Sequence, residues 1–370
     1  MDKEKAWYYL DHSFLSSLLL DEDVTDISYN GEEFFFVSNK FGRKKSDILV
    51  EPQIVKDFLR QIANIADQQF SYTNPILDVS IGRYRINATH QSIGKINDVD
   101  VTTFSIRIGF YTSKIDDDSD FFNPVIVELL KTILLHRQSI VIGGITGSGK
   151  TELQKYLLRN MPPYERVIVI DNVLELDTIR GCNDIDLTCW KVDDKNPNIS
   201  EGILIKNALR NNPDWLIVAE ARDKEMVDVL NSSMTGLPII TTIHSLDCKS
   251  MPFRMARMVQ RSDQKMDYGD ALKDIFYHFH FYIYLKKKMV NKEVKRFIAE
   301  IGLYDNNGTY TSIYRKLNSG DKYNYLTESG LSLLNDFDLP NLVKEKFVNS
   351  EVRKWKIIFW SLWLYHWLLV

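Results

Sequence analysis

The stretch "VIGGITGSGKTEL", residues 141–153, joins an apolar strand to a helix through a glycine-rich loop. From Gly144 to Thr151 it fits the pattern G-x-x-x-x-G-K-[ST], with the preceding strand and following helix that this motif requires. In such a loop the backbone N–H groups attract phosphate, Lys150 bridges the β- and γ-phosphates, and the Thr151 hydroxyl serves Mg²⁺. The stretch therefore predicts a P-loop, with ATP and Mg²⁺ as its cofactors.

Strands and helices alternate around this loop. A helical pattern covers 125–138, and apolar strands are expected at 166–171, 214–220 and 238–244, with helical patterns between them. This alternation is typical of a largely parallel sheet covered by helices, so we expect an α/β fold with a RecA-like P-loop NTPase core. The expected nucleotide contacts are Gly144, Ile145, Thr146, Gly147, Ser148, Gly149, Lys150, Thr151 and Glu152.

The sequence predicts other kinds of secondary structure before and after this core. Hairpin turns and a helical pattern that opens at Pro52 precede it, and period-two strands start at Phe276. The acidic stretch at 111–124, which ends in a proline, is typical of a linker. The expected segments are an α+β sensor-like domain at 1–110, a linker at 111–124, the P-loop ATPase domain at 125–300, a small antiparallel appendage at 301–354 and an apolar aromatic tail at 355–370.

Composition narrows the class of protein. A length of 370 residues suits about two domains, and a net charge of -4 gives the whole chain no attraction for nucleic acid. Cys182, Cys189 and Cys248 contain no C-x-x-C pair, which argues against a disulfide framework or a zinc ribbon and favours a reducing cytosol. The charged N-terminus predicts no secretory signal.

The tail has two interpretations. Residues 357–370 carry no formally charged side chain, and Arg353, Lys354 and Lys356 come just before them. As a helix they would extend about 21 Å, against about 30 Å of bilayer hydrocarbon. The tail is either a terminal helix packed against protein or an interfacial segment that makes peripheral membrane contact.

Polar residues that end the predicted strands are the candidate catalytic groups. Glu220 follows a run of apolar residues and is expected to orient the attacking water and touch the Mg²⁺ shell. Asp171 ends another strand, with Glu175 four residues on, and His244 ends a third as a γ-phosphate sensor. The carboxyl ends of parallel strands share one edge of a sheet, so these groups are expected to meet at the P-loop.

The order of these motifs resembles that of the secretion ATPases of type II and type IV secretion, type IV pili and conjugation. The resemblance rests on "GITGSGKT" at 144–151, "IDNVLEL" at 170–176, "LRNNPDWLIVAEARD" at 209–223 and "TGLPIITTIH" at 235–244. The chain lacks the closely spaced cysteines of the type II secretion and competence branch, so it looks nearest to the conjugation and type IV secretion branch. Relatives that assemble Tad pili have nearly the same motifs and stay open as an alternative.

The resemblance implies a homohexameric ring with ATP between the two domains and arginines of the first domain completing the site. Arg85 and Arg107 match those arginines. It also implies a cytoplasmic protein at the inner face of the cell membrane, with secretion or conjugation components of the inner membrane as partners. The function implied is an ATP-hydrolysing motor that couples hydrolysis to domain motion.

Three departures from the family pattern bear on turnover. Asp171-Asn172 stands where the family has Glu-Asp, Leu237 stands for a histidine, and Ala219 for a glycine. Because Lys150 and Glu220 remain, slow but real hydrolysis is expected, and an assembly scaffold that binds nucleotide with little or no turnover is the alternative.

A second alternative is a nucleic-acid translocase, suggested only by the basic run "KKKMVNKEVKR" at 286–296. Cations of this kind are typical of the solvated edge of a hairpin, so direct nucleic-acid binding is not expected.

Overall fold

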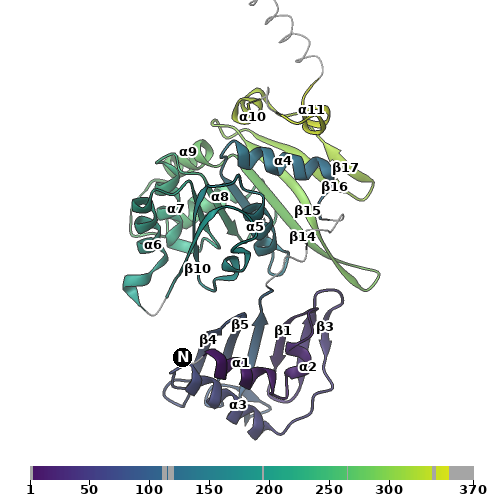
Figure 1. Cartoon of the computed structure of the whole chain (residues 1–370), viewed down its shortest axis with the longest axis vertical. Helices are drawn as coiled ribbons and strands as arrows, with labels where there is room; N and C mark the ends of the chain where they lie inside the picture. Colours follow the sequence, from purple (N-terminus) through teal and green to yellow (C-terminus); the bar gives the residue numbers. More distant parts are fainter. Residues whose placement is uncertain are drawn as a thin grey trace, which may run out of the picture. The chain divides into compact units, whose positions relative to one another are not determined.

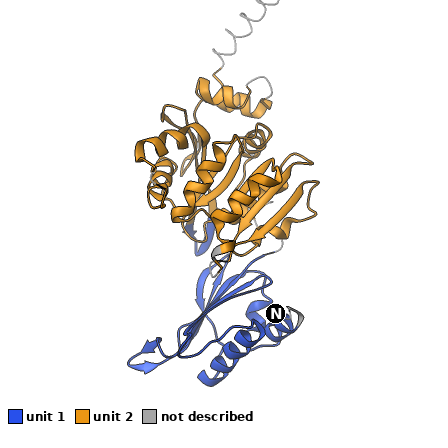
Figure 2. Cartoon of the chain, turned by 90° about the vertical axis from the view of Figure 1, so that its left-hand side faces the viewer, with its two compact units in different colours: residues 1–112, 288–295 blue, residues 113–287, 296–370 orange. Residues whose placement is uncertain are grey.

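The computed structural model describes residues 3–110, 115, 121–193, 196–264, 266–335 and 339–349 (Figure 1). Two compact units make up the chain, unit 1 from Met1–Thr112 with Lys288–Lys295 and unit 2 from Ser113–Lys287 with Arg296–Val370 (Figure 2). Most of the expected linker and the whole tail at 355–370 lie outside the described residues. No helix in the described ranges is both long and apolar enough to cross a membrane.

Unit 1 is built on an antiparallel sheet of six strands in the order β3-β2-β1-β8-β5-β4. Between β5 and β8 the chain forms a separate antiparallel ribbon of two short strands, β6 and β7. The elements are α1 (Lys3–Asp11), α2 (Ser16–Leu19), β1 (Val24–Tyr29), β2 (Phe34–Ser38), β3 (Gly42–Lys45), α3 (Pro52–Ile65), β4 (Ile76–Ile81), β5 (Tyr84–Thr89), β6 (Lys95–Ile96), β7 (Val99–Asp100) and β8 (Thr103–Ile108).

Helix α3 provides much of the core of unit 1. Pro52 occupies its first turn, where a missing N–H costs nothing, and Val55, Phe58, Leu59 and Ile62 recur at helical spacing and are buried. Burial of each such side chain contributes about 1.5–3 kcal/mol. The alternate residues of the strands point the other way and are mostly polar, as expected of an antiparallel sheet with one face on the core.

Unit 2 contains a sheet of nine strands in the order β11-β10-β12-β13-β9-β14-β15-β16-β17. The first six are parallel to their neighbours, and β15, β16 and β17 pair antiparallel. The strands are β9 (Ile140–Gly144), β10 (Arg166–Asp171), β11 (Asp186–Lys191), β12 (Trp215–Val218), β13 (Ile239–Ile243), β14 (Phe281–Val290), β15 (Glu293–Tyr304), β16 (Tyr310–Leu317) and β17 (Gly320–Tyr323).

Helices cover both faces of this sheet. Residues of α4, α5, α10 and α11 share one hydrophobic core with one face, and residues of α6 to α9 share a second core with the other. In β9, Ile140 and Ile142 belong to the first core and Val141 to the second, which is the period of two expected of a strand buried on both faces. The helices are α4 (Pro124–Leu135), α5 (Lys150–Arg159), α6 (Glu201–Ala208), α7 (Met226–Ser233), α8 (Met251–Val259), α9 (Tyr268–His278), α10 (Glu328–Leu333) and α11 (Asn341–Phe347).

The predicted fold class is confirmed, with two differences of detail at the C-terminal side. Strand β14 runs parallel to β9 with Leu285 opposite Gly144, so the antiparallel strands continue the central sheet instead of forming a separate layer. The expectation that strands start at Phe276 is wrong for the first residues, because Phe276–His278 end α9, where the Phe279 N–H still donates to the Ile275 carbonyl.

Candidate nucleotide-binding site

The loop between β9 and α5 has the backbone geometry of a phosphate cradle. Gly147 has φ +72° and Gly149 has φ +100°, both in the left-handed region that favours glycine. A Cβ on Gly144 would lie 2.9 Å from the Leu285 carbonyl oxygen of β14, so a larger residue there would push the neighbouring strand away. Glycine is therefore required at this position by close approach and at the other two by conformation.

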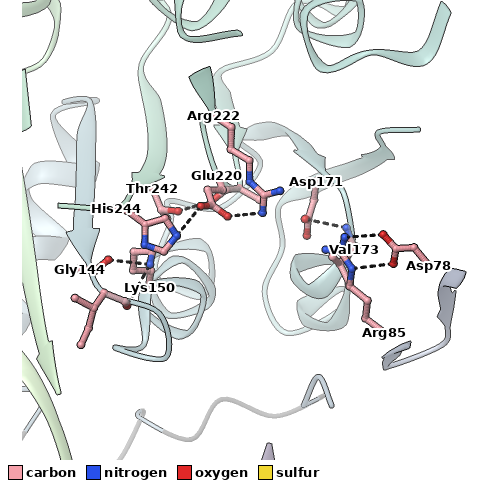
Figure 3. A network of polar contacts seen from close by, with 12 residues as sticks. Asp78, Arg85, Gly144, Lys150, Asp171, Val173, Glu220, Arg222, Thr242 and His244 are labelled. Carbon is pink, nitrogen blue, oxygen red and sulfur yellow. Dashed lines mark hydrogen bonds and ion pairs between the residues drawn. The ribbon is translucent and has the colours of Figure 1, made fainter. Parts of the chain in front are cut away.

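Lys150 begins α5 and folds back over the loop. Its Nζ donates to the carbonyl oxygens of Gly144 at 3.0 Å and Ile145 at 3.3 Å. Figure 3 shows the side chain next to Gly144 and His244. An ammonium group with three donors can exchange carbonyl partners for phosphate oxygens, which carry more charge and bind it more strongly.

The loop has an unused polar group that suits a phosphate. The Ser148 Oγ is buried and, among the described residues, has no hydrogen-bond partner. A buried hydroxyl without a partner is costly, and an anion in the cradle would satisfy it. The donor set of backbone N–H groups, Ser148 and Lys150 fits a nucleotide phosphate.

Three polar side chains cluster where β12 and β13 end (Figure 3). The Glu220 Oε1 lies 3.0 Å from His244 Nε2, and Arg222 donates from Nη2 to Glu220 Oε2 at 2.6 Å. The strand ends are fastened together, because the Thr242 Oγ1 donates to the Ala219 carbonyl at 2.8 Å. This geometry holds the carboxylate between a cation and an imidazole.

The environment lowers the pKa of both Glu220 and His244. Burial alone would raise the pKa of Glu220, but the hydrogen bond and charge of Arg222, followed by His244 and Lys150, outweigh it. For His244, burial and the charge of Lys150 lower the pKa, and Glu220 and a backbone hydrogen bond with Gly144 oppose them only in part. At neutral pH the carboxylate is therefore ionised and the imidazole is neutral.

We expect ATP hydrolysis to be insensitive to pH from about pH 7 to 8.5. Since both pKa values are lowered, the deprotonated forms persist to more acidic pH, and kcat should fall only below the ordinary imidazole value of 6.5. A kcat profile from pH 5 to 9, with melting temperatures recorded at each pH, checks this. A steep rise in kcat between pH 6.5 and 8 in folded protein would contradict it.

Asp171 lies at the end of β10 and is 7% exposed. Its Oδ1 accepts from the Val173 N–H at 3.1 Å and its Oδ2 from the Glu175 N–H at 2.9 Å. Glu175 opens the short 3₁₀ turn Glu175–Ile179, which follows Leu174 with φ +61°. In this structure both oxygens of the predicted catalytic carboxylate stabilise the turn.

Replacing Asp171 with Ala is expected to lower the apparent free energy of unfolding of unit 2 by about 2 kcal/mol, because two partly buried N–H groups, those of Val173 and Glu175, lose their acceptor. Asp177→Ala is the matched control, since Asp177 forms an exposed pair with Arg180 at 2.7 Å and should cost less than about 0.5 kcal/mol. Urea unfolding followed by circular dichroism measures both. Equal stability of the two variants would argue against a structural role for Asp171.

Arg85 and Arg107 lie in unit 1, on neighbouring strands β5 and β8. They are directly opposite each other in the register, and Arg107 also faces Asp26 of β1. Arg85 donates to Asp78 at 3.3 and 3.4 Å. The structure thus brings the two arginines together on the polar face of the sheet of unit 1, whereas the P-loop, Asp171, Glu220 and His244 are brought together in unit 2.

The two residues that follow Lys150 differ in their surroundings. Glu152 forms an ion pair at 3.1 Å with Lys155, which is fully buried in α5. Thr151 is half-buried in the first turn of the same helix. No cluster of three or more metal-ligating side chains occurs in the described part of the chain. Mg²⁺ is commonly held by one or two protein oxygens together with nucleotide phosphates, and Thr151 and Glu220 are the protein oxygens that fit this pattern.

The sequence reading missed three cations at the site. Arg222 lies within the quoted Glu220 motif, but no role was expected for it. Arg296 of β15 donates from Nε to the Gly147 carbonyl at 2.8 Å, and Lys287 of β14 also lies beside Gly147. Both belong to the basic run interpreted as a solvated hairpin edge, and only the pairing of strands far apart in the sequence brings them to the loop.

The chain is similar in sequence to known proteins. The family described as "Type II/IV secretion system protein" matches residues 117–275. A Bacillus anthracis protein, pXO2-25, is 28% identical over 318 residues, which are 82% of this chain and 70% of that protein. VirB11 of the type IV secretion system of Brucella suis biovar 1 is 33% identical over 128 residues, which are 34% of this chain and 36% of VirB11.

Solved structures have the same fold. The ATPase DotB of Legionella pneumophila superposes with a TM-score of 0.56 at 21% identity, over 83% of this chain and 82% of DotB. The pilus retraction motor PilT with bound ADP superposes with a TM-score of 0.55 at 16% identity, over 79% of this chain and 84% of PilT. At such identities the similarity is one of fold.

Proposed function

We propose that this chain is an ATP-hydrolysing motor subunit of a secretion or conjugation apparatus of the VirB type, on the basis that its residues 117–275 match the family described as "Type II/IV secretion system protein" and that it is similar to VirB11. The observation that carries the proposal is the Glu220 carboxylate, held 3.0 Å from His244 on the sheet edge that also bears the P-loop. A strand-end acid beside a P-loop is placed to activate water for attack on a phosphate.

In the proposed mechanism, the loop amides, Ser148 and Lys150 hold the phosphate chain, and the Thr151 hydroxyl and Glu220 serve the Mg²⁺ that accompanies the nucleotide. Mg²⁺ neutralises charge on the phosphates when it is bound. The Glu220 carboxylate orients a water molecule and accepts its proton. Neutral His244 has one N–H, which it donates to that carboxylate before the nucleotide binds and to the γ-phosphate when it acts as the sensor. Arg222 fixes the second carboxylate oxygen, so the water-facing geometry depends on it.

The proposed assembly is a homohexamer at the inner face of the cell membrane, with secretion or conjugation components of that membrane as partners. Similarity to VirB11, a protein of the type IV secretion system, supports the secretion part of this proposal. The apolar tail at 355–370 is the proposed site of any peripheral membrane contact. Domain motion driven by hydrolysis is the output of the motor.

Arg107→Gln is expected to lower kcat about a hundredfold if the paired arginines of unit 1 neutralise transition-state charge. Arg43→Gln is the matched control, because Arg43 is exposed on strand β3 of the same sheet and donates to the Ser28 Oγ at 3.4 Å. Phosphate release at saturating MgATP measures both variants. An Arg107→Gln rate within twofold of wild type would exclude a catalytic role for this residue.

The experiment that tests the function itself is phosphate release by the full chain with MgATP, compared with Glu220→Gln. Mg²⁺-dependent release that the variant loses supports the motor. Equal, background-level rates of phosphate release by the two proteins would contradict the motor function and favour a scaffold that binds nucleotide without turnover.

A further inference from the structure

The P-loop is held from outside by a residue that belongs to another strand. Arg296 of β15 donates from Nε to the Gly147 carbonyl oxygen at 2.8 Å. The N–H of the same peptide, that of Ser148, donates to the Ile145 carbonyl at 3.2 Å. The peptide between Gly147 and Ser148 is therefore fixed at both of its polar groups.

The fixed peptide matters because of the conformational freedom of the loop. Gly147 and Gly149 both have positive φ, where glycine has little preference of its own, so the peptide between Gly147 and Ser148 could rotate at small cost. A trans peptide points its C=O and N–H in opposite directions. Turning the Gly147 carbonyl toward Arg296 thus keeps the Ser148 N–H on the loop side, where it donates to the Ile145 carbonyl in this structure and where phosphate-binding amides must converge.

Two further contacts place the Arg296 side chain firmly beside the loop. A Cβ on Gly149 would lie 3.9 Å from Arg296 Cδ and 3.4 Å from the Phe121 ring, so the arginine stem and the ring form one wall behind that glycine. On neighbouring strand β14, Lys287 Nζ would lie 3.5 Å from a Cβ on Gly147. Arg296 and Lys287 therefore add positive potential next to the place where a phosphate is expected.

We infer that Arg296 is a positioning residue of the phosphate-binding loop, which sets the affinity for nucleotides that carry a β-phosphate by fixing the peptide between Gly147 and Ser148. Lys287 contributes through its charge. The inference rests on the proposed function to the extent that the loop must bind a nucleotide. It assigns a binding role to strands outside the four motifs that define the site.

The test measures binding of MgADP and AMP by calorimetry to the full-length wild type and to Arg296→Gln, Arg296→Lys and Lys286→Gln. Lys286 is the matched control, since it is exposed, comes from the same hairpin and has its Nζ 5.7 Å above the Tyr284 ring. Arg296→Gln should weaken MgADP binding about tenfold and AMP binding less than about twofold, because AMP has no β-phosphate. Arg296→Lys should recover part of the loss, since lysine donates to a carbonyl without the fork geometry.

Steady-state kinetics and melting temperatures separate positioning from general support of the fold. A positioning role predicts a raised KM for ATP with kcat within about twofold for Arg296→Gln, and Lys286→Gln equal to wild type. Unchanged MgADP affinity in Arg296→Gln would overturn the inference, and so would equal weakening of MgADP and AMP. If wild type fails to bind MgADP, the proposed function fails instead, which keeps the two failures distinguishable. Should Arg296→Gln not fold, the comparison of Arg296→Lys with wild type decides.

Discussion

Glu220→Gln is expected to lower the kcat of ATP hydrolysis about a thousandfold and to leave the Kd for MgATP within about twofold. The amide keeps the shape of the side chain but loses the charge that polarises water and accepts its proton. The amide also places an NH₂ group opposite either Arg222 or His244. In the wild-type structure these two side chains lie 2.6 and 3.0 Å from the carboxylate oxygens. A turnover defect without a binding defect is the signature of an interaction made mainly in the transition state.

The measurement combines single-turnover phosphate release with equilibrium binding of MgATP. Glu345→Gln on helix α11 is the control, because it removes one exposed carboxylate from the same unit and should change neither quantity. A Glu220→Gln enzyme that turns over within tenfold of wild type would show that another group activates the water.

Lys150→Ala is expected to raise the Kd for MgATP about a hundredfold, which corresponds to about 2.7 kcal/mol. The loss is that of two charge-assisted hydrogen bonds to phosphate oxygens, each worth about 1.5–3 kcal/mol, offset by release of the lysine from its present carbonyl partners. Those partners, Gly144 and Ile145, belong to the loop itself, so the fold should lose little. Unlike Glu220→Gln, Lys150→Ala should therefore show its main defect in the Kd for MgATP and not in kcat.

A third protein, Lys150→Arg, tests whether positive charge alone at position 150 is enough for nucleotide affinity. Its guanidinium keeps the charge but is planar and larger, so we expect affinity between those of wild type and Lys150→Ala. Isothermal titration with MgADP and MgATP checks the order of the three proteins. Wild-type affinity in Lys150→Ala would show that the P-loop is not the nucleotide site.

The parts of the molecule that could be predicted are those in which neighbours in sequence decide the structure. The strand, glycine loop and helix at 141–153 are contiguous, and the strands that end at or just before Asp171, Glu220 and His244 are short apolar runs whose carboxyl ends share one sheet edge in the structure. The helix at Pro52 follows from its spacing of apolar residues. Placement of these motifs on the fold needed no long-range information.

The remainder depends on contacts between distant residues. Arg296 and Gly147 are brought together because β14 pairs with β9 and β15 lies next to β14. No local sequence pattern predicts this strand order. Strand β11 was not expected, because it is an edge strand whose apolar residues are interrupted by polar ones and form no continuous apolar run. Asp171 looked catalytic from its place at a strand end, and only its two backbone partners reveal what both oxygens do in this structure.

The parallel pairing of β9 also determines the order in which the nucleotide site can form during synthesis. The strand that carries the P-loop gains one neighbour, β13, when residues 239–243 arrive, and the other, β14, only when residues 281–285 arrive. A nascent chain that ends before Phe281 therefore exposes one edge of a strand that is buried along its whole length in the folded protein, and exposed edges of this kind attract other chains. Closing such distant pairs is slow, so on the ribosome the phosphate loop is among the first parts of unit 2 to be made and among the last to be enclosed.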